Sequence, residues 1–239
     1  DDLGTAVQTC ALPIYDVFFG AQIKDWQRLA SRADSRFVIG PWSHTGGTGA
    51  ALEVDNAGGG LFQWAEMLDW LNHHLKGEPL TNSPGVASYV LGANQWKERG
   101  TWPPTTETVR FFLDGADAAN SCDGGQLRRN SEVKAGQVSY DYDPEDPVPT
   151  RGGAGMLAYA LPGFDGSSPG NQYQDGLCER EDVLTFVSDP LAEDLHIAGT
   201  IEASLTLAST AEDTAFTIKL MEVDETGRAV NIRDAITRL

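Results

Sequence analysis

The chain has 239 residues, of which 41% are hydrophobic and 22% are charged, a balance typical of a globular protein with a packed core. Acidic residues outnumber basic ones by 35 to 17, which gives a net charge of −18. Such a surface repels phosphate backbones and anionic lipid, so we expect neither nucleic acid nor a membrane among the partners. Self-association into an oligomer stays possible, and the composition leaves the cellular compartment open.

Residues 15–107 carry alternating helix and strand signals. Apolar side chains recur at helical spacing in two segments, and two short apolar runs are typical of buried strands. The predicted helices are 19–30 and 61–75, and the predicted strands are 36–40 and 86–91. This alternation predicts the C-terminal part of an α/β sheet.

After Trp102-Pro103-Pro104 the sequence changes to β-branched runs separated by turn residues. The predicted strands are 109–113, 183–187, 196–207 and 215–223, and apolar and polar side chains alternate within the third of these. Residues 115–180 are dominated by Gly, Pro, Asp, Ser and Asn, which predicts a long loop that lies over the neighbouring domain. We expect an all-β sandwich of the jelly-roll type over residues 108–239.

The two ends of the chain differ from the rest. Residues 1–14 show no periodicity and join abruptly to Tyr15, so we expect this segment to be non-native or artefactual. The chain stops at Leu239 soon after the strand predicted at 215–223. We therefore expect the β-sandwich to be truncated at its C-terminus.

Two polar residues follow apolar segments in the α/β part. Asp16 lies after an apolar stretch and before a predicted helix, and His44 lies in a loop of small residues just past the strand at 36–40. Alone, Asp16 is typical of a helix N-cap and His44 of a surface loop. Together they match the order of an α/β-hydrolase, in which the acid and then the histidine follow successive strands. They are the candidate catalytic acid and base.

Several segments share their order and spacing with one family. They are Tyr15-Asp16-Val17-Phe18, Arg36 to His44, Leu68 to Gly77, Val90 to Trp96 with Trp102-Pro103, Tyr142-Asp143-Pro144, Pro147 to Thr150, Gly152-Gly153, Arg180 to Leu184, and Asp213 to Val223. The chain resembles, from about residue 15 to 238, the cocaine esterase / X-Pro dipeptidyl-peptidase-like (CocE/NonD) serine hydrolases. This resemblance implies an α/β-hydrolase domain with a helical cap inserted before the acid, a C-terminal jelly roll, and no cofactor.

The resemblance also implies a Ser-His-Asp triad, in which His44 is the general base and Asp16 holds its tautomer. The family's nucleophile lies in a strand–turn–helix elbow far upstream of the acid. We expect that part to be absent here and the fragment alone to be inactive. Ser168 fits the G-x-S-x-G pattern literally, but the following Pro169 has no N–H for an oxyanion and the order of the triad is wrong.

The residues after Asp16 indicate which class of substrate the enzyme would accept. Relatives that hydrolyse α-amino acid esters carry two carboxylates there, by the same resemblance, whereas this chain has Phe18 and Phe19. An apolar pair cannot compensate an ammonium group. This favours an ester, amide or peptide substrate with a neutral, hydrophobic acyl group and makes Phe18 a candidate substrate-binding residue. Core packing is the alternative for Phe18.

The remaining candidates for metal or redox chemistry are weak. His73-His74 lack a third ligand at helical spacing, and the carboxylates at 141–146 lack the spacing of an EF-hand, so we expect no metal. His196 begins a predicted strand and is expected to be structural. Cys122 and Cys178 could pair in an exported protein or stay free thiols, and Cys10 lies in the segment 1–14.

A second hypothesis is a non-catalytic binding protein, whose jelly roll would recognise a carbohydrate or another protein chain. All six tryptophans lie before residue 103, which leaves the predicted β domain without an aromatic platform for a sugar. Asp16 and His44 in hydrolase order favour the enzyme.

Overall fold

The computed structural model describes residues 11–32, 35–44, 46–49, 51–55, 57–82, 85–134, 136–155 and 168–238. Their contacts divide them into two compact units. The first draws on residues 1–104, 151–173 and 201–239, and the second on residues 105–150 and 174–200. The contacts thus group the last segment of the chain with the first, whereas the sequence predicts one contiguous domain over 108–239.

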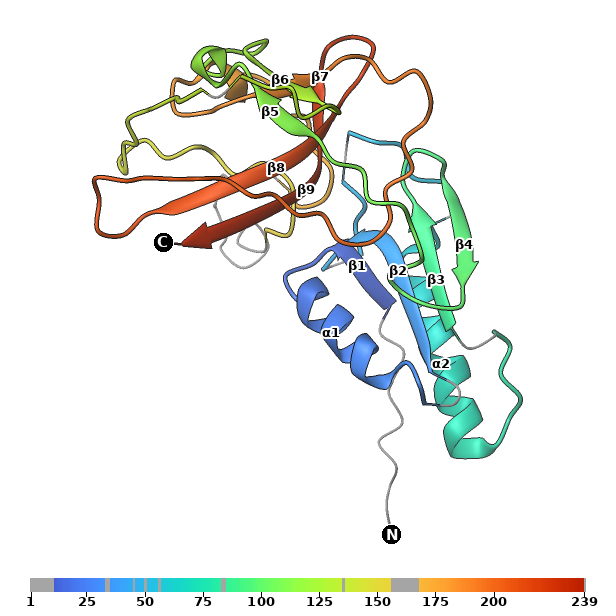
Figure 1. Ribbon diagram of the computed structural model, residues 1–239. Helices are drawn as coiled ribbons and strands as arrows, with labels where there is room; N and C mark the ends of the chain where they lie inside the picture. The colour runs from blue at the N-terminus through green and yellow to red at the C-terminus, as the bar shows by residue number, and fades with distance from the viewer. Residues whose placement is uncertain are drawn as a thin grey trace. The chain divides into compact units, whose positions relative to one another are not determined.

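A four-stranded sheet in the order β1-β2-β3-β4 lies in the first unit (Figure 1). Its strands are β1 Ala11–Tyr15, β2 Arg36–Ser43, β3 Gly85–Val90 and β4 Gln95–Arg99. The first three run parallel, and β4 returns antiparallel to β3. The strands predicted at 36–40 and 86–91 are confirmed. β1 includes residues 11–14, which show no periodicity in the sequence, and residues 1–10 with Cys10 lie outside the described residues.

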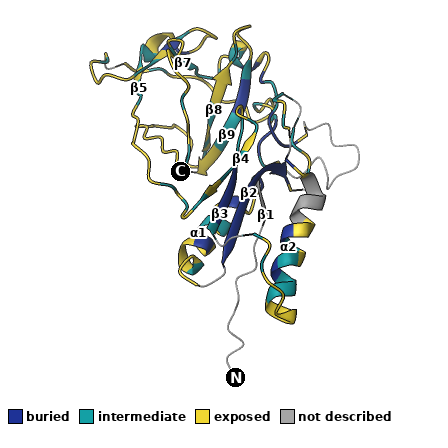
Figure 2. Cartoon of the chain, turned by 90° about the vertical axis from the view of Figure 1, so that its right-hand side faces the viewer, coloured by how far each residue is buried: buried dark blue, intermediate teal, exposed yellow. Residues whose placement is uncertain are grey.

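Two helices, α1 Phe19–Leu29 and α2 Gly59–Lys76, confirm the two helical patterns. Phe37 of β2 stacks on Trp26 of α1 with ring centroids 5.3 Å apart, and the adjacent Arg36 pairs with Glu66 of α2. Because successive side chains of a strand point to opposite faces, the two helices cover opposite faces of the sheet. Figure 2 shows β2 buried along its whole length between them, as expected for a parallel strand.

Arg36 also links three elements of the first unit. Its guanidinium contacts Glu66 of α2, with Nε 2.8 Å from Oε2, and Glu98 of β4, with Nη2 3.0 Å from Oε1. Asn82 donates a further hydrogen bond to Glu66. Burial alone would lower the pKa of Arg36, but the hydrogen bonds and charges of the two glutamates outweigh it and raise that pKa. The arginine is thus held in its charged form inside the fold.

A β-hairpin, β8 Ala215–Val223 and β9 Ala229–Arg238, belongs to the same unit. β8 confirms the strand predicted at 215–223, whereas β9 is not predicted. The turn between them is closed by Asp224, whose Oδ1 accepts the backbone N–H groups of Thr226 and Arg228. This turn carries one glycine, Gly227 with φ of 83°, and is a weak sequence signal.

The second unit contains a three-stranded sheet in the order β5-β6-β7. Its elements are β5 Phe112–Asp114, β6 Gly125–Arg128, β7 Phe186–Ser188 and the 3-10 helices η1 Ala116–Ala118 and η2 Leu177–Glu179. β5 and β7 overlap the predicted strands at 109–113 and 183–187. β6 lies inside the stretch 115–180, which the sequence analysis treats as a loop.

The strand predicted at 196–207 is wrong. These residues form no strand, and the apolar positions Ile201 and Leu205 are 47% and 42% exposed. Their alternation mimics a half-buried strand, but none of the strands that the structure describes pairs with this segment. The described strands of the β-rich part form a three-stranded sheet and a hairpin, so the jelly roll stays a prediction. Among the described residues, no helix has the length and apolar character needed to cross a bilayer.

Candidate active site

Asp16 lies at the carboxyl end of β1, in the turn that leads into α1. Its side chain is buried, and its Oδ1 accepts the backbone N–H of Phe18 at 2.8 Å. The backbone N–H of Phe19 donates to the Asp16 carbonyl at 3.2 Å. The N-cap of α1 is Phe18 rather than Asp16. The turn therefore fixes the carboxylate while leaving its second oxygen for another partner.

The residue before the acid, Tyr15, is buried as well. Burial is the main cause that raises the pKa of its phenol, with a smaller contribution from Asp234 in the same direction. The phenol therefore stays neutral over the physiological pH range and adds no charge beside Asp16.

His44 lies one residue beyond the end of β2, on a tight turn. Ser43 is fully buried, its N–H donates to the Gly47 carbonyl at 2.6 Å, and the Gly46 N–H donates back to the Ser43 carbonyl at 2.9 Å. The imidazole itself is 38% exposed. The turn thus anchors the backbone on both sides of a histidine that stays accessible.

A β-bulge brings the acid and the histidine together. Pro13 lies opposite Gly40, but Tyr15 lies opposite Ser43, so two residues of β2 face the single residue Ile14 of β1. Without this extra residue, Asp16 would face Ser43, and His44 would point to the other side of the sheet. With it, Asp16 and His44 leave neighbouring strands side by side.

The two side chains meet directly. His44 Nδ1 lies 2.9 Å from Asp16 Oδ2. A carboxylate at this distance accepts the Nδ1–H, so the neutral imidazole keeps the lone pair of Nε2 free. The described geometry is therefore suited to a general base whose tautomer is fixed by an acid.

The two phenylalanines after Asp16 have different surroundings. The Phe18 ring is 51% exposed and lies 5.7 Å from the imidazole, centroid to centroid. Phe19 is buried in the core with Trp26 and Phe37. Of these two residues, Phe18 is the one whose side chain lies next to His44, and its part in substrate binding stays a prediction.

Asn171, which no sequence pattern indicates, contacts the segment that follows the histidine turn. This fully buried side chain makes three hydrogen bonds to backbone groups of residues 48–52. The partners are about 120 positions away in sequence, so no local pattern could have indicated the contact. A polar residue directly after Pro169-Gly170 is the only hint in the sequence, since such a turn can bring a side chain against another backbone.

The other histidines take part in local contacts. His73 donates through Nδ1 to the Glu78 carbonyl at 2.7 Å, and the His74 ring lies 4.1 Å from that of Trp70. His196 is exposed and lies outside any strand. In the part of the chain that the structure describes, no three histidine, cysteine or carboxylate side chains come together as a metal would require.

The acidic residues at 141–146 are partly neutralised by an arginine. Asp141, Asp143 and Asp146 line a hollow of about 250 Å³ together with residues 180–182. Arg180 contacts Asp182 through Nε at 2.7 Å and Asp146 through Nη1 at 3.1 Å. This cluster is thus organised by an internal ion pair.

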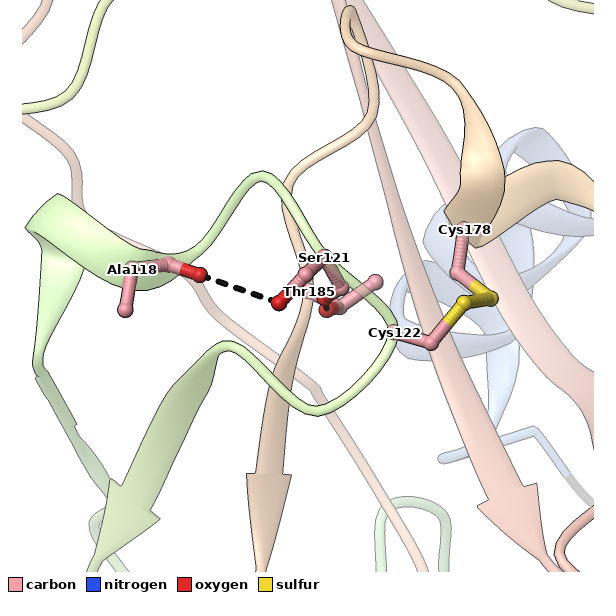
Figure 3. The surroundings of a disulfide bond; sticks show 5 residues. All are labelled: Ala118, Ser121, Cys122, Cys178 and Thr185. Carbon is pink, nitrogen blue, oxygen red and sulfur yellow. Dashed lines mark hydrogen bonds between the residues drawn. A yellow bond between two sulfur atoms is a disulfide. The ribbon is translucent and has the colours of Figure 1, made fainter.

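Cys122 and Cys178 form a disulfide within the second unit, which resolves the two alternatives that the sequence leaves open. Figure 3 shows the bond beside a network of loop contacts. Ser121 donates to the Ala118 carbonyl, and Thr185 donates to the Ser121 carbonyl. The disulfide joins η2 to the turn that follows η1.

The comparisons with known proteins agree on one group of hydrolases. Residues 79–239 match the family model described as the X-Pro dipeptidyl-peptidase C-terminal non-catalytic domain. The cocaine esterase of Rhodococcus sp. (strain MB1 Bresler) is 34% identical over 233 residues, which cover 94% of this chain and 39% of that protein. A Mycobacterium bovis protein named as a serine esterase is 28% identical over 219 residues, which cover 87% of this chain and 31% of that protein.

A solved structure is similar over nearly the whole chain. It is the crystal structure of an aminopeptidase from a marine sediment Thaumarchaeota archaeon, with a TM-score of 0.65 and 25% sequence identity. The match covers 95% of this chain and 39% of that one. The chain therefore spans well under half of the length of these proteins.

Proposed function

Because the chain belongs to the cocaine esterase / X-Pro dipeptidyl-peptidase-like (CocE/NonD) family of hydrolases, we propose that it carries the acid and the general base of a Ser-His-Asp ester or amide hydrolase. The observation that supports this most directly is the 2.9 Å contact between Asp16 Oδ2 and His44 Nδ1. The fold around it is proposed to be the C-terminal part of an α/β-hydrolase domain. The nucleophilic serine is proposed to come from a segment upstream of residue 15.

In this proposal His44 moves the proton and Asp16 stabilises the charge. Nε2 takes the proton of the serine hydroxyl as its oxygen attacks the carbonyl carbon of the substrate. Asp16 stabilises the imidazolium that forms. When the tetrahedral intermediate collapses, the imidazolium gives its proton to the departing alkoxide or amine, and an acyl-enzyme remains. Water, deprotonated by the same Nε2, then attacks the acyl carbon. The bond to the serine oxygen breaks, the carboxylic acid product leaves, and the imidazolium returns its proton to the serine oxygen.

Phe18 is proposed to contact the acyl group of the substrate. Its exposed ring beside the imidazole offers an apolar surface where the leaving and acyl groups must approach His44. An aromatic ring stabilises an apolar or aromatic acyl group and leaves an ammonium without a counter-charge. Neutral hydrophobic esters are therefore the preferred substrate class.

The test uses the complete protein, including the segment upstream of residue 15, with an aryl ester of benzoic acid as substrate. Asp16→Asn is expected to lower kcat by about 10⁴-fold, because the amide favours the wrong imidazole tautomer. His44→Ala is expected to be at least as damaging. The matched controls are Asp25→Asn and His196→Ala, which change an exposed carboxylate and an exposed histidine.

Two results would contradict the proposal. One is hydrolysis by the Asp16→Asn variant within about threefold of the unmodified rate, far from the loss expected for a triad acid. The other is ester turnover by the 239-residue chain alone, which is expected to be inactive. A clear preference of the complete enzyme for α-amino acid esters over benzoate esters would overturn the assignment of Phe18 and leave the dyad standing.

A further inference from the structure

We propose that Asn171 is a positioning residue for His44 and that Asn231 of β9 holds Asn171 in place. The proposal rests on the proposed function, since it gives Asn171 a task only where the Asp16–His44 pair is catalytic. Asn171 and Asn231 both lie within residues 79–239, the range that matches a domain described as non-catalytic. The proposal therefore gives this range a part in positioning the general base.

The side chain of Asn171 binds the backbone that follows the histidine turn. Its Oδ1 accepts the N–H groups of Ala51 at 2.8 Å and Leu52 at 2.7 Å, and its Nδ2 donates to the Thr48 carbonyl at 2.9 Å. Asn171 is fully buried, so water does not compete for these groups. One amide thus fixes three backbone groups within eight residues of His44.

This contact completes the support of the turn that carries His44. At the other end the turn is held by β2 and by the hydrogen bond from Ser43 N–H to the Gly47 carbonyl. The hydrogen bonds between Ser43, Gly46 and Gly47 close the turn itself, and Asn171 adds a fixed point at its exit, where the chain could otherwise rotate about Gly47 and Gly49. Asn171 therefore restrains the direction of the imidazole toward Asp16.

The backbones around Asn171 touch, which leaves the segment little room to shift. Gly49 has φ of +95°, and a Cβ there would lie 2.4 Å from the Asn171 nitrogen. Gly170 has φ of +101°, and a Cβ there would lie 2.7 Å from the Gly49 Cα. Only glycine fits at such close approaches. The contact is thus a specific fit of two chain segments.

Asn231 holds the residues on either side of Asn171. It is fully buried on β9, its Oδ1 accepts the N–H of Gln172 at 2.7 Å, and its Nδ2 donates to the Gly170 carbonyl at 3.2 Å. The backbone N–H of Asn231 also donates to the Gln172 carbonyl at 3.3 Å. Two buried asparagines, Asn231 and Asn171, therefore connect β9 to the segment after the histidine turn through hydrogen bonds.

The test reads the tautomer of His44 by NMR in the 239-residue chain, labelled with ¹⁵N-histidine. Long-range ¹H–¹⁵N spectra at about pH 8 distinguish a proton on Nδ1 from one on Nε2 of a neutral imidazole. The signal of His44 is assigned by its loss in His44→Gln. Asn171→Ala is expected to raise the ratio of the Nε2–H to the Nδ1–H form at least about threefold, in the direction of the Asp16→Ala variant.

The control separates positioning from loss of stability. Val86→Ala removes a fully buried side chain of β3 in the core and destabilises the same unit without touching the histidine turn. Val86→Ala is expected to leave the tautomer ratio unchanged. An unchanged ratio in Asn171→Ala, or an equal change in both variants, would overturn the proposal.

A second measurement uses only the unmodified chain, so it does not depend on whether a variant folds. The amide protons of Ala51 and Leu52 in the unmodified chain are expected to exchange at least about 100-fold more slowly than in an unstructured peptide, because Asn171 accepts both. Exchange at the peptide rate would overturn the proposal. Neither readout requires a nucleophile, so a positive result with no hydrolysis by the complete protein would reject the proposed function alone.

Discussion

Asp16 divides its two carboxylate oxygens between two tasks. Oδ1 accepts the N–H of Phe18, which locks the side chain to its own turn, and Oδ2 faces His44. The acid-then-histidine order of an α/β-hydrolase was enough to pair these two residues, although the sequence did not predict β1 before Asp16. The bulge that aligns them could not be predicted, because it depends on which residues of β1 and β2 lie opposite each other.

Asp182 allows a pH-dependent prediction. Hydrogen bonds from Arg180 lower the pKa of this carboxyl, with a smaller opposing effect of burial. A carboxyl with a lowered pKa in the folded state stabilises the fold above its unfolded pKa of about 3.9 and loses this contribution as the pH falls through the folded value. Asp182→Asn is therefore expected to lower the free energy of unfolding by about 1.5–3 kcal/mol at neutral pH, measured by urea denaturation.

The same comparison below about pH 4 should show a shrinking difference between the two proteins. Asp141→Asn, which changes an exposed carboxylate of the same unit, is the control and is expected to have little effect at either pH. A difference between Asp182→Asn and the unmodified chain that stays constant down to about pH 2 would contradict the role given to the Arg180 pair.

At the scale of elements, β9 contacts segments near both Asp16 and His44. Asn231 anchors the segment behind the histidine turn, and Arg233, two residues further, donates to the Ile14 carbonyl at 2.6 Å and lies over the Phe19 ring. Ile14 precedes Asp16 in the chain and Phe19 follows it, so β9 contacts the chain on both sides of the acid. Through Asn231, β9 also holds the segment that supports His44.

The elements that were predicted correctly carry their signal locally. α1, α2 and β2 are defined by apolar spacing within a few turns or residues. The segment 196–207 has an equally clear pattern and forms no strand, because pairing depends on a partner that the pattern does not supply. Asn171 was missed for the same reason, since its backbone partners lie about 120 residues away.

At the element scale, Arg36 is the residue whose loss should matter most. Arg36→Leu leaves the Glu66 carboxylate, which is 5% exposed, without its charged partner. Removing one member of a buried ion pair typically costs about 3–5 kcal/mol. We expect a loss of this size in the free energy of unfolding of the first unit, measured by urea denaturation.

Glu98→Gln is the matched comparison, because it changes the other partner of Arg36, whose side chain is 63% exposed. Exposed pairs contribute about 0–1 kcal/mol, so this variant is expected to stay close to the unmodified protein. Equal effects of the two substitutions would show that burial of Glu66 is not what makes the network important.

On the scale of the whole molecule, the disulfide should stabilise one unit and leave the other unchanged. Both cysteines lie in the second unit, 56 residues apart in sequence. Closing a loop of this size stabilises a fold by about 2–4 kcal/mol. The double variant Cys122→Ser with Cys178→Ser is therefore expected to increase amide hydrogen exchange in residues 105–150 and 174–200.

The peptides of the first unit serve as the internal control of that experiment. Exchange at β2, β3 and α2 is expected to match that of the unmodified chain, because both cysteines lie outside the first unit. An equal rise in exchange in both units would mean that they unfold as a single cooperative body.

The first unit is assembled from three separate stretches of chain, and this has a consequence for biosynthesis. Asp16 and His44 are translated 28 residues apart, but Asn231 and Arg233 follow almost two hundred codons after His44. During translation the two catalytic candidates therefore leave the ribosome well before the strand that braces them exists. A nascent chain interrupted before β9 carries both Asp16 and His44 but lacks Asn231 and Arg233. The acid and the histidine therefore reach their restrained geometry only near the end of synthesis of this unit.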